Sequence, residues 1–413
     1  MKRGMSPLPF QRKNKIGLIL SGGGARAAYQ VGVLQGIADA LPNGAPNPFP
    51  IVCGTSAGAI DAVGLAARAC DFRGAIAHML RIWGQLHVGK IYRAGFFDIL
   101  RTVAHWLLSL LHSRPANSVS LLDNEPLARL ISQCVDFSGI EKAVAAGSLD
   151  AVCITASGYA SGQAVSFFQG KPELDAWCRA RRFGARTQLA PAHVLASTAI
   201  PFLFCPIRIG DEYFGDGSMR QLAPFSPALH LGAERVLAIT VGRSVPDTSI
   251  SASRGARLPP LAQIAGFMLD SVFLDAIEMD LERIERINNT VSHVIGHISD
   301  GHGAALRRIE TLVLAPSEDI SAIAMRHAEA LPKSLRMLMR CLGGKGNGGA
   351  NLLSYLLFEK PFVRELIELG RRDAQTRIEE ILRFLDCESM PIRAGATIHE
   401  LPDATRTLRR GAM

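Results

Sequence analysis

Two short apolar runs near the start of the chain each lead directly into a glycine-containing turn and then into an apolar helical pattern. The first run covers residues 16–20 (IGLIL) and continues as SGGGARAAYQVGVL, and the second covers residues 51–53 (IVC) and continues as GTSAGAIDAV. Uniformly apolar runs of this length are typical of strands that are buried on both faces. Two strand–turn–helix units in succession predict a parallel sheet with helices on both faces.

Short apolar runs of the same kind recur later in the chain, between longer stretches with a helical pattern. The stretch of about 66–145 is mainly helical in pattern, and the chain is again mostly helical after Ile264. The segment 272–287 is amphipathic, with aliphatic residues on one side and a row of Glu and Arg on the other. The further strands that we expect are 151–158, 235–242 and 310–317.

These patterns divide the chain into three parts. Residues 1–15 form a basic N-terminal tail, residues 16–245 an α/β domain whose helical insertion is about 66–145, and residues 246–413 a helix-rich region. The run at 310–317 is a candidate additional strand of the same sheet, because it has the composition of a buried strand. It therefore argues against a sharp boundary near residue 245.

One predicted helix, at 96–113 (FFDILRTVAHWLLSLLHS), has a narrow polar stripe on an otherwise apolar surface. Its polar residues recur mostly at steps of three and four positions. Two interpretations stay open: a core helix beneath a loop, or a lid or interfacial segment that touches a bilayer.

The five residues Gly54–Gly58 must turn the chain sharply from the second strand into its helix. The residue at the apex, Ser56, is forced towards a strained backbone conformation, and Gly54 and Gly58 leave room for the strand and helix to pass closely. We expect this elbow to push the Ser56 hydroxyl into the open at the positive end of a helix, as a nucleophile requires. The backbone N–H of Ala57 is then a candidate oxyanion donor. The alternative is a chance Gly-x-Ser-x-Gly in a chain with 39 glycines.

A serine hydroxyl needs a base that accepts its proton. None of the eleven histidines lies in a loop after a late strand, where a Ser-Asp-His hydrolase would place it, and His193 and His230 are the nearest to plausible site segments. Asp216 is a stronger candidate, because a short strand and a turn deliver it just before Gly217. The alternative for this pair is an ordinary Asp-Gly hairpin turn.

The glycines at positions 22, 23 and 24 supply a third element of a site. Backbone N–H groups at the start of a helix have no partners within the helix, so Gly22, Gly23 and Gly24 can hold a phosphate or an oxyanion. Together with Ala27 they also satisfy the dinucleotide pattern G-x-G-x-x-A. That pattern requires an acidic residue about 20 positions further on. The corresponding region, PNGAPNPFPIV, has none, so nucleotide binding is a weak alternative.

Composition narrows the function classes. Of 413 residues, 48% are hydrophobic and 20% are charged, which is typical of a globular protein with a large core. The eight cysteines include no C-x-x-C pair, and Cys53, Cys153 and Cys205 lie in apolar runs, so we expect reduced core residues rather than disulfides or zinc ligands. We expect no metal and no cofactor, because no clustered ligands accompany the candidate site.

The charge and hydropathy of the chain indicate which partners it binds and where in the cell we expect it. The net charge of +8 suits either nucleic acid or an anionic lipid surface, but only 6% of residues are aromatic and they do not alternate with the basic clusters, so we expect no nucleic-acid partner. The chain contains no run of about 18 uncharged apolar residues, so we expect no transmembrane helix. The N-terminus lacks the apolar core of a signal peptide. We expect a cytoplasmic protein, with peripheral contact to a membrane as a further expectation.

Three motifs, SGGGARAAYQVGVL, GTSAGAI and DGS, occur in this order over roughly residues 16–245, and the chain resembles the patatin-like phospholipases through them. The stretch ASTAIPFLFCPIRIGDEYFGDGS is also similar to the segment of that family that leads into its catalytic aspartate. The resemblance implies a three-layer α/β/α fold with a mainly parallel central sheet, here followed by a helix-rich C-terminal region.

The resemblance also implies roles for individual residues. It implies a Ser-Asp dyad without histidine, with Ser56 as nucleophile and Asp216 as general base, and an oxyanion hole at residues 22–24. Arg26 matches the family's basic residue, which steadies the loop or binds the substrate headgroup. An aspartate near its reference pKa of about 3.9 is a weak base. The site must therefore raise that pKa, or the serine proton must move late in the reaction, when the oxyanion is already stabilised. Two departures from the family pattern are Ser218 and Gln221.

The expected function is that of a lipid acyl hydrolase, similar to a phospholipase A or lysophospholipase, that acts through an acyl-enzyme. Its expected partners are a phospholipid or other acyl-lipid substrate and, transiently, an anionic membrane surface. Two alternatives stay open: a soluble esterase or thioesterase that uses the same dyad, and a non-catalytic membrane-docking protein with the same fold.

Overall fold

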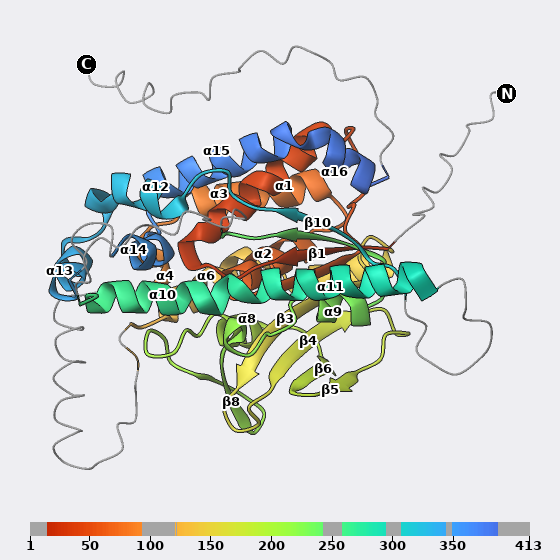
Figure 1. Cartoon of the computed structure of the whole chain (residues 1–413), viewed down its shortest axis with the longest axis horizontal. Coiled ribbons are helices and arrows are strands. Elements are labelled where there is room, and N and C mark those ends of the chain that lie inside the picture. Colours follow the sequence, from red (N-terminus) through yellow and green to blue (C-terminus); the bar gives the residue numbers. More distant parts are fainter. Residues whose placement is uncertain are drawn as a thin grey trace, which may run out of the picture.

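The computed structural model describes residues 15–92, 120, 122–242, 258–294, 307–343 and 349–386. A single mixed sheet runs through the described part of the chain, with helices packed on both of its faces (Figure 1). The strand order is β10-β9-β1-β2-β3-β4-β6-β5, and β8 pairs with both β3 and β7. The predicted helix at 96–113 lies outside the described residues.

The parallel half of the sheet contains the five strands expected from the apolar runs. β1 (Ile16–Leu20) lies between β2 (Ile51–Thr55) and β9 (Arg235–Ile239), and β3 (Ala151–Gly158) continues the sheet beyond β2. β10 (Glu310–Leu314) pairs with β9 in parallel, so a strand from the C-terminal part of the chain forms one end of this sheet.

The other half of the sheet is mostly antiparallel, and of its strands the sequence predicted only the short one that leads into Asp216. β4 pairs antiparallel with β3, and β5 and β6 form a hairpin at the far edge. β5 and β6 are short and each has a single buried residue, so no uniformly apolar run marks them. The bounds are β4 Ala164–Gly170, β5 Trp177–Arg179, β6 Arg182–Arg186, β7 Ile207–Ile209 and β8 Glu212–Asp216.

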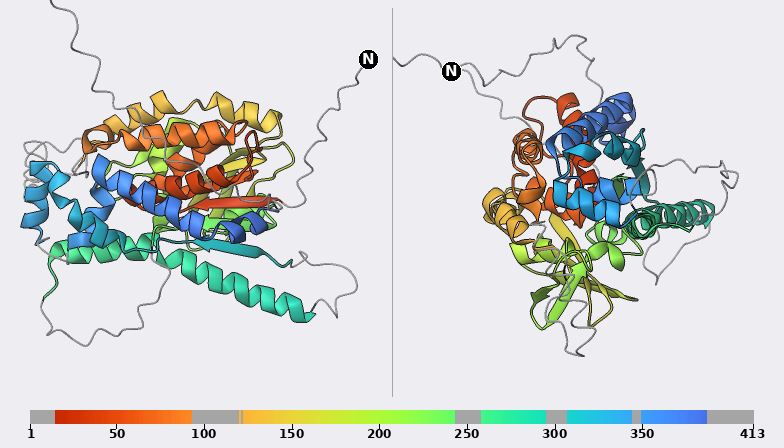
Figure 2. Two further views of the ribbon diagram at one scale, coloured as in Figure 1. Left: turned by 90° about the horizontal axis from the view of Figure 1, so that it is seen from above. Right: turned by 90° about the vertical axis from the view of Figure 1, so that its left-hand side faces the viewer.

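One face of the sheet is covered by α1 (Ala28–Ala40), α2 (Ala57–Ala66), α3 (Phe72–Gly84) and α15 (Lys360–Thr376). Their apolar residues form one core with the strand residues that point to this side. α15 lies along α1 in both Figure 1 and Figure 2. The hydroxyl of Tyr29 in α1 donates a hydrogen bond to Asp373 in α15, over 3.1 Å.

The opposite face is covered by α9 (Ser226–His230) and α11 (Asp275–Val294), whose Ile277 and Ile284 are buried against the sheet. This arrangement of helices, sheet and helices confirms the predicted three-layer fold. α10 (Leu261–Phe273) precedes α11 almost in line with it (Figure 1), so the amphipathic segment expected at 272–287 is divided at Leu274.

The remaining helices complete the layers and the C-terminal region. None of the helices in the described ranges is long and apolar enough to cross a membrane. Cys53 and Cys153 are buried and reduced as expected, whereas Cys205 is only partly buried. The bounds are α4 Val88–Ile91, α6 Glu125–Cys134, α7 Ser138–Ala145, α8 Pro191–Ser197, α12 Ile320–Arg326, α13 Lys333–Cys341, α14 Ala350–Leu356 and α16 Ile378–Phe384.

Candidate active site

The expected elbow lies between β2 and α2. Its apex, Ser56, has φ 54° and ψ −127°, a region that residues with a side chain seldom adopt. The two glycines permit the close passage of strand and helix. A Cβ on Gly58 would lie 2.2 Å from the carbonyl oxygen of Leu20, and one on Gly54 would lie 2.3 Å from the carbonyl oxygen of Gly58.

Ser56 and Asp216, 160 positions apart in the sequence, are hydrogen-bonded: the serine Oγ donates to the carboxylate Oδ2 over 2.5 Å. β8 ends at Asp216 and pairs with β3, the neighbour of β2, which brings the two residues together. The other carboxylate oxygen accepts a hydrogen bond from the backbone N–H of Ser218, over 2.9 Å. Asp216 therefore begins a short 3-10 turn (Gly217–Met219) rather than the alternative hairpin turn.

Burial changes the acidity of this carboxyl group. Asp216 is 1% exposed, and burial raises its pKa to about 6, while the hydrogen bonds from Ser56 and Ser218 lower it. The burial effect is the larger, because loss of hydration disfavours the charged form. A pKa close to neutral meets the condition that a general base in this position must satisfy.

Two further polar residues hold the elbow in place. Ser197, at the end of α8, accepts a hydrogen bond from the backbone N–H of Ser56 over 2.9 Å and donates to the carbonyl oxygen of Thr155 over 2.6 Å. Gln221 accepts from the Thr55 hydroxyl and donates to the Thr155 hydroxyl. Sequence reasoning assigned neither role; the signals were that Ser197 belongs to the ASTAIP segment before Asp216 and that Gln221 departs from the family pattern.

The glycine loop after β1 lies directly beside the turn that follows Asp216. A Cβ on Gly22 would lie 2.6 Å from the Ser218 Oγ. Gly23 precedes a 3-10 turn (Gly24–Ala27), where Gly24 has φ 55° and a Cβ would lie 2.4 Å from the Tyr355 carbonyl oxygen. Only glycine combines this backbone conformation with such close packing. The loop is thus brought to the same place as Ser56 and Asp216.

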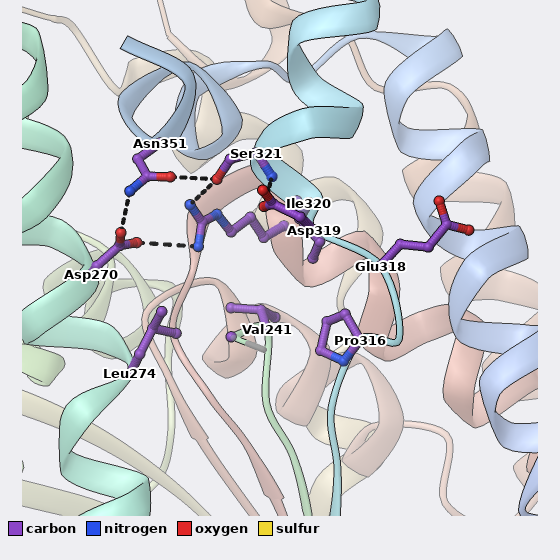
Figure 3. A pocket seen from close by; sticks show the side chains of 11 residues that line it. Val241, Asp270, Leu274, Pro316, Glu318, Asp319, Ile320, Ser321 and Asn351 are labelled. Carbon is purple, nitrogen blue, oxygen red and sulfur yellow. Dashed lines mark hydrogen bonds and ion pairs between the residues drawn. The ribbon is translucent and has the colours of Figure 1, made fainter. Parts of the chain in front are cut away.

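Arg26 follows this loop and is 3% exposed. Its Nε donates to Ser354 over 2.7 Å, its remaining nitrogens contact Ser321 and Asp270 over 3.3 Å each, and its guanidinium lies 3.9 Å from the centre of the Tyr355 ring. Figure 3 shows the part of this cluster that contains Ser321 and Asp270, both of which also contact Asn351. Of the two roles expected for Arg26, the geometry favours steadying the loop over binding a headgroup.

The same cluster borders a cavity of about 220 Å³ that is shown in Figure 3. Its lining is mostly polar and includes Asp270, Asp319 and Ser321, and Val241 lies between it and Gly23. Within the described ranges, no group of three or more His, Cys, Asp or Glu side chains is arranged to hold a metal ion.

The expectation that the elbow exposes Ser56 is wrong: Ser56 is only 2% exposed. The end of α10 covers the site, and a Cβ on Gly22 would lie 2.5 Å from the ring of Phe273. The cavity beside Thr55 and Ser218 measures about 20 Å³, room for about one water molecule. The local pattern around Ser56 predicts the elbow but has no information about a helix that follows some 200 positions later.

The two candidate histidines lie away from the dyad. His193 packs against Phe167 and bonds through Nδ1 to the backbone of Ala190, and burial lowers its pKa. His230 stacks on Trp177 with ring centres 5.0 Å apart. Within the described part of the chain, the side-chain partner of the Ser56 hydroxyl is Asp216.

Comparison with solved structures finds similar chains of low sequence identity. Human GIVD cytosolic phospholipase A2 in complex with methyl γ-linolenyl fluorophosphonate has 14% identity and a TM-score of 0.40, covering 92% of this chain. VipD from Legionella pneumophila has 14% identity and a TM-score of 0.31, and the match covers 80% of this chain and 67% of the VipD chain. This chain thus spans 60% of the length of the human chain.

Comparison with curated proteins finds no match. The model of the family described as patatin-like phospholipase matches residues 18–229, which is about half of the chain and includes the glycine loop, the elbow and Asp216. The chain therefore belongs to the patatin-like phospholipase family.

Proposed function

We propose that the protein is a lipid acyl hydrolase that cleaves fatty-acyl esters with Ser56 as nucleophile and Asp216 as general base. The observation that carries this proposal is the 2.5 Å hydrogen bond from the Ser56 hydroxyl to a buried carboxylate whose pKa is raised to about 6. Membership of the patatin-like phospholipase family supports an acyl-lipid substrate.

In the proposed reaction, the Ser56 Oγ attacks the ester carbonyl carbon while its proton moves to the Oδ2 of Asp216. The tetrahedral intermediate collapses, the C–O bond to the leaving alcohol breaks, and the alcohol takes the proton from Asp216. Water then attacks the acyl-enzyme and gives a proton to Asp216, and the fatty acid leaves as the proton returns to Ser56.

The oxyanion that forms in each half of the reaction needs hydrogen-bond donors. Ala57 is the first residue of α2, so its N–H has no partner within the helix and lies at the positive end of the helix dipole. The loop at residues 22–24 lies beside the dyad and is the second source of donors in the proposal. Such donors typically contribute about 10²–10³ in rate.

Hydrolysis of anionic phospholipid vesicles tests this proposal. Fatty-acid release is measured for the wild type, Ser56→Ala and Asp216→Asn, with Ser132→Ala as a control because Ser132 is an exposed serine on α6. We expect a loss of at least about 10³-fold for the first two variants and none for the control. Circular dichroism establishes that each variant is folded. Retained turnover by folded Ser56→Ala would exclude the dyad.

A soluble ester and a fluorophosphonate probe separate the alternatives. Hydrolysis of a short-chain ester with no release from vesicles would favour a soluble esterase or thioesterase. Vesicle binding without fluorophosphonate labelling would favour a docking protein that keeps the fold without the chemistry. Hydrolysis of vesicle lipids together with labelling at Ser56 supports the proposed function, with peripheral contact to the membrane as part of it.

A further inference from the structure

α10 is apolar on two opposite faces. Its inner face contains Ala262, Gly266 and Phe273, which are buried. At 3.6 residues per turn, the opposite side carries four large apolar residues that we call the α10 surface. Its members are Leu261, Ile264, Phe267 and Met268, exposed by 58%, 42%, 70% and 61%.

A surface of this kind is unusual on a soluble protein. Large apolar side chains clustered on one exposed helix face mark a place of interaction more often than isolated ones do. Asp270 is the only charged residue of α10, and it points to the inner cluster, where it contacts Arg26 and Tyr355. The α10 surface itself therefore carries no charge.

The helix that adjoins the start of α10, α13, is positively charged. The backbone N–H of Ala262 donates to the carbonyl oxygen of Leu342, over 2.9 Å, so the start of α10 adjoins the end of α13. α13 contains three basic residues and no acidic one, and its exposed stripe includes Met337. The basic residues are Lys333, Arg336 and Arg340.

α10 also lies between the solvent and the dyad. Its last residue, Phe273, packs on Gly22, and the cavity beside Ser218 has room for about one water molecule. A long acyl chain that approaches the glycine loop from this side therefore has to pass this helix. Figure 1 and the right-hand view of Figure 2 show α10 at the outside of the described part of the molecule.

We propose that the α10 surface, flanked by the basic residues of α13, docks on an anionic lipid bilayer. The inference rests on the proposed function, because a lipid substrate places the protein at such a surface, and it names the face that makes contact. Apolar side chains enter the boundary between headgroups and acyl chains, and lysine and arginine beside them attract anionic headgroups. Docking through α10 brings the bilayer to the helix that covers the dyad.

Vesicle binding by the full-length Ser56→Ala protein tests the proposal, since this background leaves the lipids intact. Sedimentation is measured with vesicles of phosphatidylcholine containing phosphatidylglycerol and with vesicles of phosphatidylcholine alone. We expect Phe267→Asp with Met268→Asp to weaken binding at least about tenfold. Arg336→Gln with Arg340→Gln should weaken binding to the phosphatidylglycerol vesicles at least about tenfold and remove most of their advantage over phosphatidylcholine.

Tyr213→Asp is the matched control, because Tyr213 is an aromatic residue 55% exposed on β8, away from α10 in Figure 1. It should bind as the background does, and thermal unfolding should show that all variants are folded. Unchanged binding by the folded α10 variant overturns the proposal. A second result would also overturn the proposal: light scattering shows that the wild type is a dimer, the α10 substitutions make it a monomer, and vesicle binding is not weakened. Hydrolysis is not part of the readout, so a failure of the proposed chemistry is seen separately.

Discussion

In the proposed reaction, Asp216 must accept a proton from Ser56, and its environment acts on the carboxyl group in opposite directions. Burial raises the pKa, and hydrogen bonds from Ser56 and Ser218 lower it, with a result of about 6. The aspartate is therefore a better base than a solvated one, without any histidine in the dyad.

The pH dependence of hydrolysis follows from this pKa. Only the ionised carboxylate accepts the serine proton, so kcat/KM for a soluble ester should rise with pH and level off above about pH 7, with an apparent pKa of about 6. The measurement is a pH–rate profile from about pH 3 to about pH 8. An inflection near pH 4 would show that burial does not raise this pKa. An inflection that disappears in His193→Gln, whatever its position, would identify a histidine base.

The glycines of Gly54–Gly58 have a local pattern that predicts the elbow, whereas the pairing of Ser56 with Asp216 was expected only from the resemblance to the family, because an Asp-Gly pair alone is typical of an ordinary turn. The supporting hydrogen bonds of Ser197 and Gln221 could not be predicted from the sequence, since a buried serine or glutamine has no pattern that distinguishes it from any other. The burial of Ser56 could not be predicted either, because it depends on a distant helix.

At the scale of elements, the contact between α10 and the glycine loop depends on a charge pair. Arg26 and Asp270 lie 3.3 Å apart with side chains 4% and 24% exposed. Removing one partner of such a pair leaves the other charge buried without compensation, which is costly.

Asp270→Ala should therefore lower the free energy of unfolding by about 3 kcal/mol, measured by urea denaturation. Asp211→Ala is the control, because its pair with Arg208 is 3.6 Å long and fully solvated. That variant should change stability by less than about 0.5 kcal/mol. Equal effects of the two substitutions would show that the Arg26 cluster does not fasten α10 to the loop.

Most of the strands that apolar runs predict are buried along all or nearly all of their length, and β10 is the exception, because its buried residues alternate with partly exposed ones. β1, β2, β3, β9 and β10 are apolar throughout or nearly so, and each corresponds to an expected run. β5 and β6 have only three and five residues, with one buried residue each, and are too short and too exposed for a periodic signal. The sequence predicted α10 only as part of a mostly helical region. A helix with two apolar faces has no single row of apolar residues that would indicate which side is buried.

At the scale of the whole molecule, the expected boundary near residue 245 separates segments that share a sheet and a core. β10 extends the sheet beside β9, and α15 covers α1. The loop that follows β1 is held through Arg26 by residues of α10, α12 and α14. We propose that 16–245 and the helix-rich region fold as one unit.

A chain that ends at residue 245 should consequently fail to fold. It would expose the apolar side of α1 and leave Arg26 without its partners, so we expect little soluble protein and no cooperative thermal transition. A chain that ends at residue 386 is the control, because it keeps every element of the described structure. A cooperative transition together with fluorophosphonate labelling in the shorter chain would show that the catalytic part is independent.

The packing of α15 on α1 also has a consequence for synthesis on the ribosome. The hydrogen-bonded residues Tyr29 and Asp373 are 344 positions apart. At about 5–20 residues per second, α1 emerges about 20–70 s before the helix that covers it. During that time the nascent chain has an apolar helix surface without its final cover. The growing chain, rather than the finished protein, is then the species most in need of a chaperone.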